Sequence, residues 1–174
     1  MFTFGFSPQP TYTISAGAVN VVDTIETGAT SQYQGFGIYF SGNPAGTDCL
    51  DASRYSGISF TLSGSLMGAG CAMQFSINDS EHAPSSTSFD PKAAGPVGSY
   101  APQLSLTNAE LTSTATTIMV PFAGTGAPVG GSPPTPIDPS KLISVQWWMS
   151  TPVTSNGEPT ECVWNVNLSN VSFY

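Results

Sequence analysis

Charged side chains are scarce in this chain. Lysine and arginine number 3 and aspartate and glutamate 11, so charged residues make up 8% of the 174 residues, against about 25% in a typical soluble domain. A net charge of −8 with three cations argues against nucleic-acid partners and anionic membranes, because both require basic patches. A helical protein is also disfavoured, since helices cover their outer faces with charged helix formers. The composition therefore favours an uncharged partner.

Long apolar runs and histidine are also nearly missing. No segment approaches the roughly 20 consecutive apolar residues of a membrane-spanning helix, so we expect no membrane insertion. His82 is the single histidine and no G-x-S-x-G motif occurs, which leaves little material for a nucleophilic triad. The 10 Phe, 6 Tyr and 3 Trp supply the apolar area that disordered chains lack. We therefore expect a folded domain.

Apolar residues recur at every second position in short segments that Gly or Pro interrupts, which is the pattern of β-strands. At least eight such segments predict an all-β fold, an antiparallel β-sandwich of the jelly-roll type, as one domain over residues 1–174. The last segment changes phase at Ser169 and Asn170, which predicts a β-bulge. The main predicted core positions are Phe36, Ile38, Phe60, Met73, Phe75, Ile77, Val145, Trp147, Met149, Trp164, Val166 and Leu168, followed after the bulge by Val171 and Phe173.

The same alternation predicts a second face on each strand, which points away from the core. That face is built from uncharged amides and hydroxyls with one Trp and one Tyr. Amides hydrogen-bond to pairs of sugar hydroxyls, and an aromatic ring packs on the apolar side of a pyranose. The alternative is an ordinary polar outer face that keeps the domain soluble without charge. The predicted ligand-binding residues are Tyr39, Gln74, Ser76, Gln146, Trp148 and Asn165.

The acidic residues argue against catalysis. A glycosidase needs two carboxylates about 5–9 Å apart, whereas the acids here, Asp23 among them, fall in predicted loops or at strand ends. The densest ionisable cluster is Asp79, Glu81 and His82. Metal binding or acid–base chemistry is one interpretation of this cluster, and a solvated turn is favoured because the spacing matches no ligand motif. Loop oxygens could also bind calcium, so a structural calcium ion stays open while no metal site is predicted.

Three cysteines are present, Cys49, Cys71 and Cys162. By alternation, Cys71 and Cys162 both lie on the core side at the starts of their strands, so they can meet if those strands are neighbours. A disulfide between them would suit a secreted, charge-poor domain. Two buried free thiols are the alternative, and Cys49 is left without a predicted partner.

Three stretches carry a family resemblance: residues 48–64, residues 71–81, and residues 137–151 together with 162–174. Their most specific marks are the phrase D-A-S-x-Y-x-G-I-x-F and the terminal N-V-x-F-Y. Over 33–174 the chain resembles secreted bacterial jelly-roll domains similar to galactose-binding-like carbohydrate-binding modules. The resemblance implies a glycan cleft on the polar face of one sheet, formed by the six residues predicted above, and a structural calcium ion near the chain ends. The acidic calcium ligands of the family have no counterpart in the N-terminal segment.

The leading hypothesis is a secreted or cell-surface domain that binds a neutral polysaccharide without catalysis. A second hypothesis is a structural surface, filament or adhesion subunit that self-associates through Phe2, Phe4 and Phe6, because an exposed strand of alternating Phe invites strand addition. A third is an endo-acting glycoside hydrolase with an unrecognised carboxylate pair. Of these, a non-enzymatic role is favoured.

Overall fold

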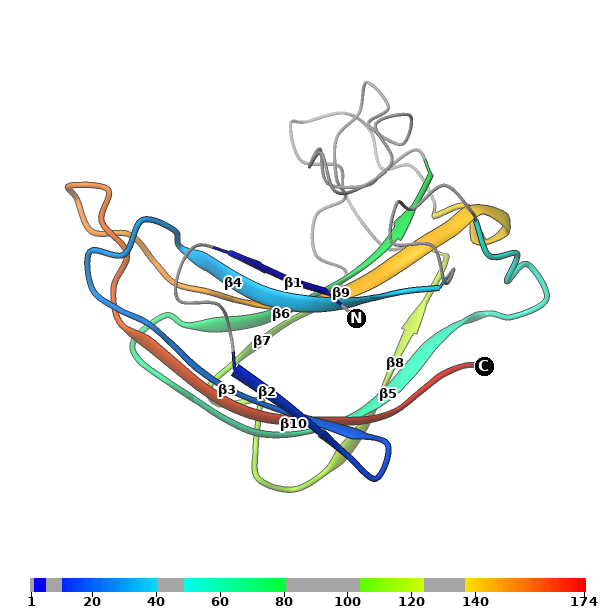
Figure 1. Cartoon of the computed structure of the whole chain (residues 1–174), viewed down its shortest axis with the longest axis horizontal. Coiled ribbons are helices and arrows are strands. Elements are labelled where there is room, and N and C mark those ends of the chain that lie inside the picture. Colours follow the sequence, from blue (N-terminus) through cyan, green and yellow to red (C-terminus); the bar gives the residue numbers. More distant parts are fainter. Residues whose placement is uncertain (1, 6–10, 41–48, 81–103, 124–136) are drawn as a thin grey trace.

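The structure is a computed structural model, and it describes residues 2–5, 11–40, 49–80, 104–123 and 137–174. These residues form two stacked five-stranded sheets in which all neighbouring strands are antiparallel (Figure 1). Sheet A has the order β1 (Phe2–Gly5), β4 (Tyr33–Tyr39), β9 (Leu142–Ser150), β6 (Ala72–Asp79) and β7 (Leu104–Thr107). Sheet B has the order β2 (Thr11–Ser15), β3 (Ala18–Ile25), β10 (Cys162–Phe173), β5 (Gly57–Met67) and β8 (Thr116–Pro121). The predicted β-sandwich is confirmed.

The core between the sheets is aromatic. Trp147 of β9 is fully buried at its centre, 5.5 Å from the ring of Phe36 and 5.4 Å from the ring of Phe60 on the other sheet. Phe75 also contacts both Trp147 and Phe60. Side chains on alternate positions of each strand thus meet across the sandwich. The core faces predicted from the period-two pattern are therefore correct for these strands.

The predicted bulge lies in β10. The pairing of β10 with β5 shifts register between Ser169 and Ser172, and Asn170 has φ of 53°. The extra residue turns Phe173 inward, where its ring lies 5.3 Å from Phe40 and 5.3 Å from Tyr55. The bulge therefore lets Phe173, near the end of β10, pack against the core.

A disulfide joins the two sheets. Cys71 immediately precedes β6 of sheet A, Cys162 begins β10 of sheet B, and their Cα atoms lie 5.9 Å apart. Both residues are buried, which confirms the pairing predicted from alternation, whereas Cys49 is an exposed free thiol. Gly68 packs against the bridge with φ of 116°, and a Cβ there would lie 2.5 Å from Cys71 Sγ. The bridge therefore depends on a residue without a side chain at position 68.

The sheets are curved in the same sense. In Figure 1 the strands of sheet A bow so that its outer face, the one turned away from sheet B, is concave. The chain segment before β9 forms a short 3₁₀ turn, η1 (Pro139–Lys141), at one end of sheet A. In the described part of the chain, no helix is long and apolar enough to cross a membrane.

Candidate ligand-binding face

The concave face of sheet A collects five of the six predicted ligand-binding residues. Antiparallel register aligns Gln74 with Trp148, Ser76 with Gln146, and Tyr39 with Ser144. Residues that are directly opposite in such a ladder point to the same side of the sheet. Since the neighbouring Phe75 and Trp147 point into the core, all five side chains lie on the outer face. None of the five carries a charge.

The middle of this face is more enclosed than the sequence predicts. Trp148 lies on the outward face as predicted, but its exposed fraction is only 9%, and those of Gln146 and Ser76 are 8% and 1%. The Ser76 hydroxyl is buried without a hydrogen-bond partner in the described part of the chain. Buried polar groups are normally paired, so this hydroxyl is an exception within the enclosed middle of the face. The middle of the outer face of sheet A is therefore largely buried, and not an exposed surface.

One accessible aromatic residue of this face was not predicted from the sequence. Tyr33 has an exposed fraction of 44% and shares the outer side of β4 with Tyr39. The intervening outward positions are Gly35 and Gly37, which have no side chains. The two tyrosines are six positions apart along the strand, a span of about 20 Å. A ring therefore stands at each end of a strand whose middle presents only backbone, and the alternation of YQGFGIY carried this signal.

The Tyr39 hydroxyl remains uncharged at neutral pH. Partial burial raises the pKa of the Tyr39 phenol, because a phenolate loses solvation there. The Gln32 side-chain amide donates a hydrogen bond to the Tyr33 hydroxyl. No carboxylate, ammonium or guanidinium group occupies an outward position on the described strands of sheet A. The face is therefore suited to uncharged, hydroxyl-bearing ligands.

Asn165 does not belong to this face, so its assignment to the same cleft is wrong. It lies on β10, opposite Val22 and Ser65, on the outer side of sheet B. Alternation identifies an outward side chain but not the sheet that carries it, because sheet membership depends on long-range pairing. The polar positions Ser63 and Asn167 also lie on sheet B, so the chain has two separate polar faces.

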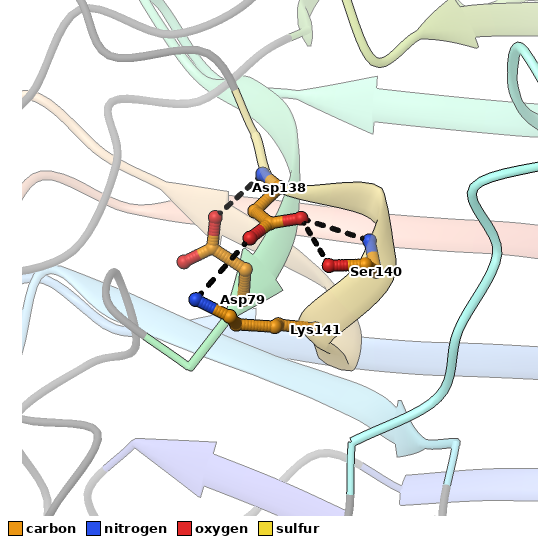
Figure 2. A network of polar contacts seen from close by, with 4 residues as sticks. All are labelled: Asp79, Asp138, Ser140 and Lys141. Carbon is orange, nitrogen blue, oxygen red and sulfur yellow. Dashed lines mark hydrogen bonds and ion pairs between the residues drawn. The ribbon is translucent and has the colours of Figure 1, made fainter.

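Asp79, the described member of the predicted ionisable cluster, is buried and not part of a solvated turn. Figure 2 shows Asp79 accepting a hydrogen bond from the backbone N–H of Asp138 at 2.9 Å. Asp138 accepts from the Ser140 hydroxyl at 2.6 Å and from its backbone N–H at 3.0 Å, and Lys141 Nζ lies 3.4 Å from its carboxylate. The Ser140 hydroxyl is the main cause that lowers the pKa of Asp138. These carboxylates therefore attach η1 to the end of β6. Glu81 and His82 lie outside the described residues.

The described residues contain no group of three or more His, Cys, Asp or Glu side chains that could hold a metal ion. The described residues therefore contain no cluster of acidic side chains for the calcium ion that the family resemblance implies. Backbone carbonyl and hydroxyl oxygens can also bind calcium, so we derive no chemistry from a metal here.

One acidic residue lies inside a strand, contrary to our expectation. Asp23 sits within β3, directly opposite Trp164, and its Oδ2 atom is buried without a hydrogen-bond partner among the described residues. Burial raises the pKa of Asp23, and the Thr24 backbone and the Trp164 side chain oppose this shift only in part. The charged form of Asp23 is therefore unfavourable in the folded protein.

This placement predicts a pH-dependent gain from Asp23→Asn. Because the folded-state pKa is raised above its reference value of 3.8, the charged carboxylate lowers stability once the pH rises above that value, and the cost disappears in acid. We expect the variant to be more stable than wild type at neutral pH, by less than about 1 kcal/mol because Asp23 is partly exposed and solvent screens its charge, and equal to wild type near roughly pH 3, as measured by chemical denaturation.

Asp51→Asn is the matched control, because the Ser53 hydroxyl and backbone N–H lower the pKa of Asp51. Its expected effect at neutral pH has the opposite sign, since it removes a carboxylate that the fold favours. A neutral-pH loss of stability in Asp23→Asn would contradict the placement.

Comparisons with known proteins identify a fold and no family. The chain matches no described protein family, and a search of curated proteins finds no relative. A solved structure, a family 11 carbohydrate-binding module from Clostridium thermocellum in complex with a β-1,3-1,4-mixed-linked tetrasaccharide, is similar with a TM-score of 0.50 and 20% sequence identity. The similarity covers 97% of this chain and 88% of that chain. It confirms the jelly-roll fold that the sequence resemblance implied.

Proposed function

We propose that this chain binds a neutral polysaccharide, without catalysis, on the concave face of sheet A. The observation that carries the proposal is the convergence of Tyr39, Gln74, Ser76, Gln146 and Trp148 on one charge-free face, with Tyr33 added by the structure. The fold shared with a carbohydrate-binding module supports it. The disulfide between the sheets is typical of proteins outside the reducing cytosol, so we propose that the protein is secreted or exposed at the cell surface.

The geometry suggests how a glycan chain would lie. Tyr33 and Tyr39 can each stack on the apolar side of a pyranose ring, and Gly35 and Gly37 let the chain approach the backbone between them. Beside this track, Gln146 offers its side-chain amide to the sugar hydroxyls. The ligand would therefore run along β4 and β9 and contact several rings. Affinity is expected to be modest, because hydroxyl-rich ligands lose much hydration on binding.

Affinity electrophoresis tests this proposal directly. We expect gels containing mixed-linked β-glucan or another neutral polysaccharide to retard the protein, and raising the salt to roughly 1 M to leave the retardation unchanged, since no ion pair is involved. Gels with a polyanionic polysaccharide are the control, because a chain of net charge −8 should not bind them. Retardation by none of a wide set of neutral polysaccharides would overturn the proposal.

A further inference from the structure

The outer face of sheet B, on the opposite side of the sandwich, has a polar hollow of its own. It has a volume of about 240 Å³ and lies between β10 and β5. Its wall is formed by serine and asparagine side chains around a glycine, without a charged or aromatic residue. The lining residues are Ser63, Gly64, Ser65, Ser113, Asn165 and Asn167.

A hydrogen-bonded ladder orients the two asparagines. Asn20 of β3 donates from Nδ2 to Asn165 Oδ1 at 3.2 Å and to Asn167 Oδ1 at 3.0 Å, and also approaches the carbonyl of Val166 at 3.2 Å. Both carbonyl oxygens are thereby turned toward β3. Because each oxygen accepts from Asn20, the Nδ2 donors of Asn165 and Asn167 are left for other partners, and both residues line the hollow.

The opposite wall depends on Gly64. Its φ is 145°, and a Cβ there would lie 2.2 Å from the carbonyl oxygen of Asn165, so only glycine lets β5 approach β10 this closely. The Gly64 N–H donates to the Thr112 carbonyl at 2.8 Å, which holds the neighbouring Ser113 at the rim. No hydrogen bond of the Ser63, Ser65 or Ser113 hydroxyls, or of the two Nδ2 groups, is found within the described ranges.

We infer that this hollow is a second binding site, for a single polyhydroxylated ring such as one pyranose unit. Three hydroxyls and two amide donors converge there without a charged residue, which fits a neutral, hydroxyl-bearing ligand. The volume is below the roughly 300 Å³ of pockets for drug-sized ligands, which matches a ligand of about one ring. The site stands on its own geometry, whereas the choice of a sugar over other polyols rests on the proposed function.

Two sites on opposite faces would let one molecule bridge two glycan chains. The concave face of sheet A would bind along a chain, and the hollow on sheet B would bind a single ring, such as a chain end or a branch. Such bivalent contact increases overall attachment to an insoluble polysaccharide even when each site is weak.

Nuclear magnetic resonance titration of the isotope-labelled protein tests this inference. The probes are the methyl glycosides of glucose, galactose, mannose and xylose, added up to roughly 100 mM so that millimolar dissociation constants are measurable. At least one glycoside should shift the side-chain amide signals of Asn165 and Asn167 and the backbone signals of Ser63 and Ser65 in a saturable way. Glycerol is the control for a non-specific polyol.

Variants separate this site from the one on sheet A. Asn165→Ala combined with Asn167→Ala should weaken binding at the hollow roughly tenfold, while Thr13→Ala, on the same face outside the hollow, should leave it unchanged. Ser63→Ala combined with Ser65→Ala is the second test if the first variant does not fold.

The inference is overturned if no glycoside shifts these signals, if glycerol shifts them equally, or if the shifts persist undiminished in the folded variants. A response on sheet B alone would support this site and count against the proposed function. A response on sheet A alone would do the reverse.

Discussion

Replacing Cys71 and Cys162 together by alanine should lower the free energy of unfolding by about 4 kcal/mol. The bridge closes a loop whose ends are 91 residues apart in the sequence, and a crosslink of that span strongly restricts the unfolded chain. It also ties sheet A to sheet B at the starts of β6 and β10. A domain of this size has only about 5–15 kcal/mol of total stability. The variant should therefore unfold at a clearly lower denaturant concentration than wild type.

Denaturation in urea, followed by tryptophan fluorescence, measures this loss. Cys49→Ala is the matched control, because Cys49 is exposed and unpaired, and it should change stability by less than about 0.5 kcal/mol. Adding a reductant to wild type should reproduce the double variant. Equal stability of wild type with and without reductant would show that the bridge contributes nothing to the fold.

Much of the fold could be predicted from the sequence, because alternation is a local property. The period-two pattern predicts that Trp147 and Phe75 lie in the core, and its change of phase at Ser169 and Asn170 predicts the bulge. The structure confirms both. The same parity placed Cys71 and Cys162 inward. Each of these inferences needs only the direction of a side chain relative to its own strand.

The wrong predictions concern features that local alternation does not determine, such as the sheet to which a strand belongs. Asn165 points outward as expected, but β10 lies in sheet B and not beside β9 and β6. Trp148 also points outward, yet its exposure depends on the rest of the chain and not on its strand. Tyr33 and Asp23 were missed because β4 and β3 extend further than the apolar pattern indicated. Strand ends are the least predictable part of an element from sequence alone.

Removing both accessible rings of the concave face should abolish most glycan binding. Tyr33→Ala combined with Tyr39→Ala should weaken binding about 100-fold, since each ring contributes about 1.4 kcal/mol through stacking on a pyranose. We choose the tyrosines over Trp148, because Trp148 has an exposed fraction of only 9% and its removal would also disturb packing. Replacing each tyrosine by phenylalanine should keep most of the affinity, since the ring supplies the main contact.

Calorimetric titration of wild type, the double tyrosine variant and Tyr12→Ala is the most direct test of the central claim. Tyr12 is a matched control, because its exposed fraction of 42% is close to the 44% of Tyr33 but it lies on β2 of sheet B. With the neutral oligosaccharide that retards wild type most, we predict wild-type affinity for Tyr12→Ala and a loss of about 100-fold for the double variant. Unchanged affinity in the double variant, with its fold intact, would contradict binding on the concave face.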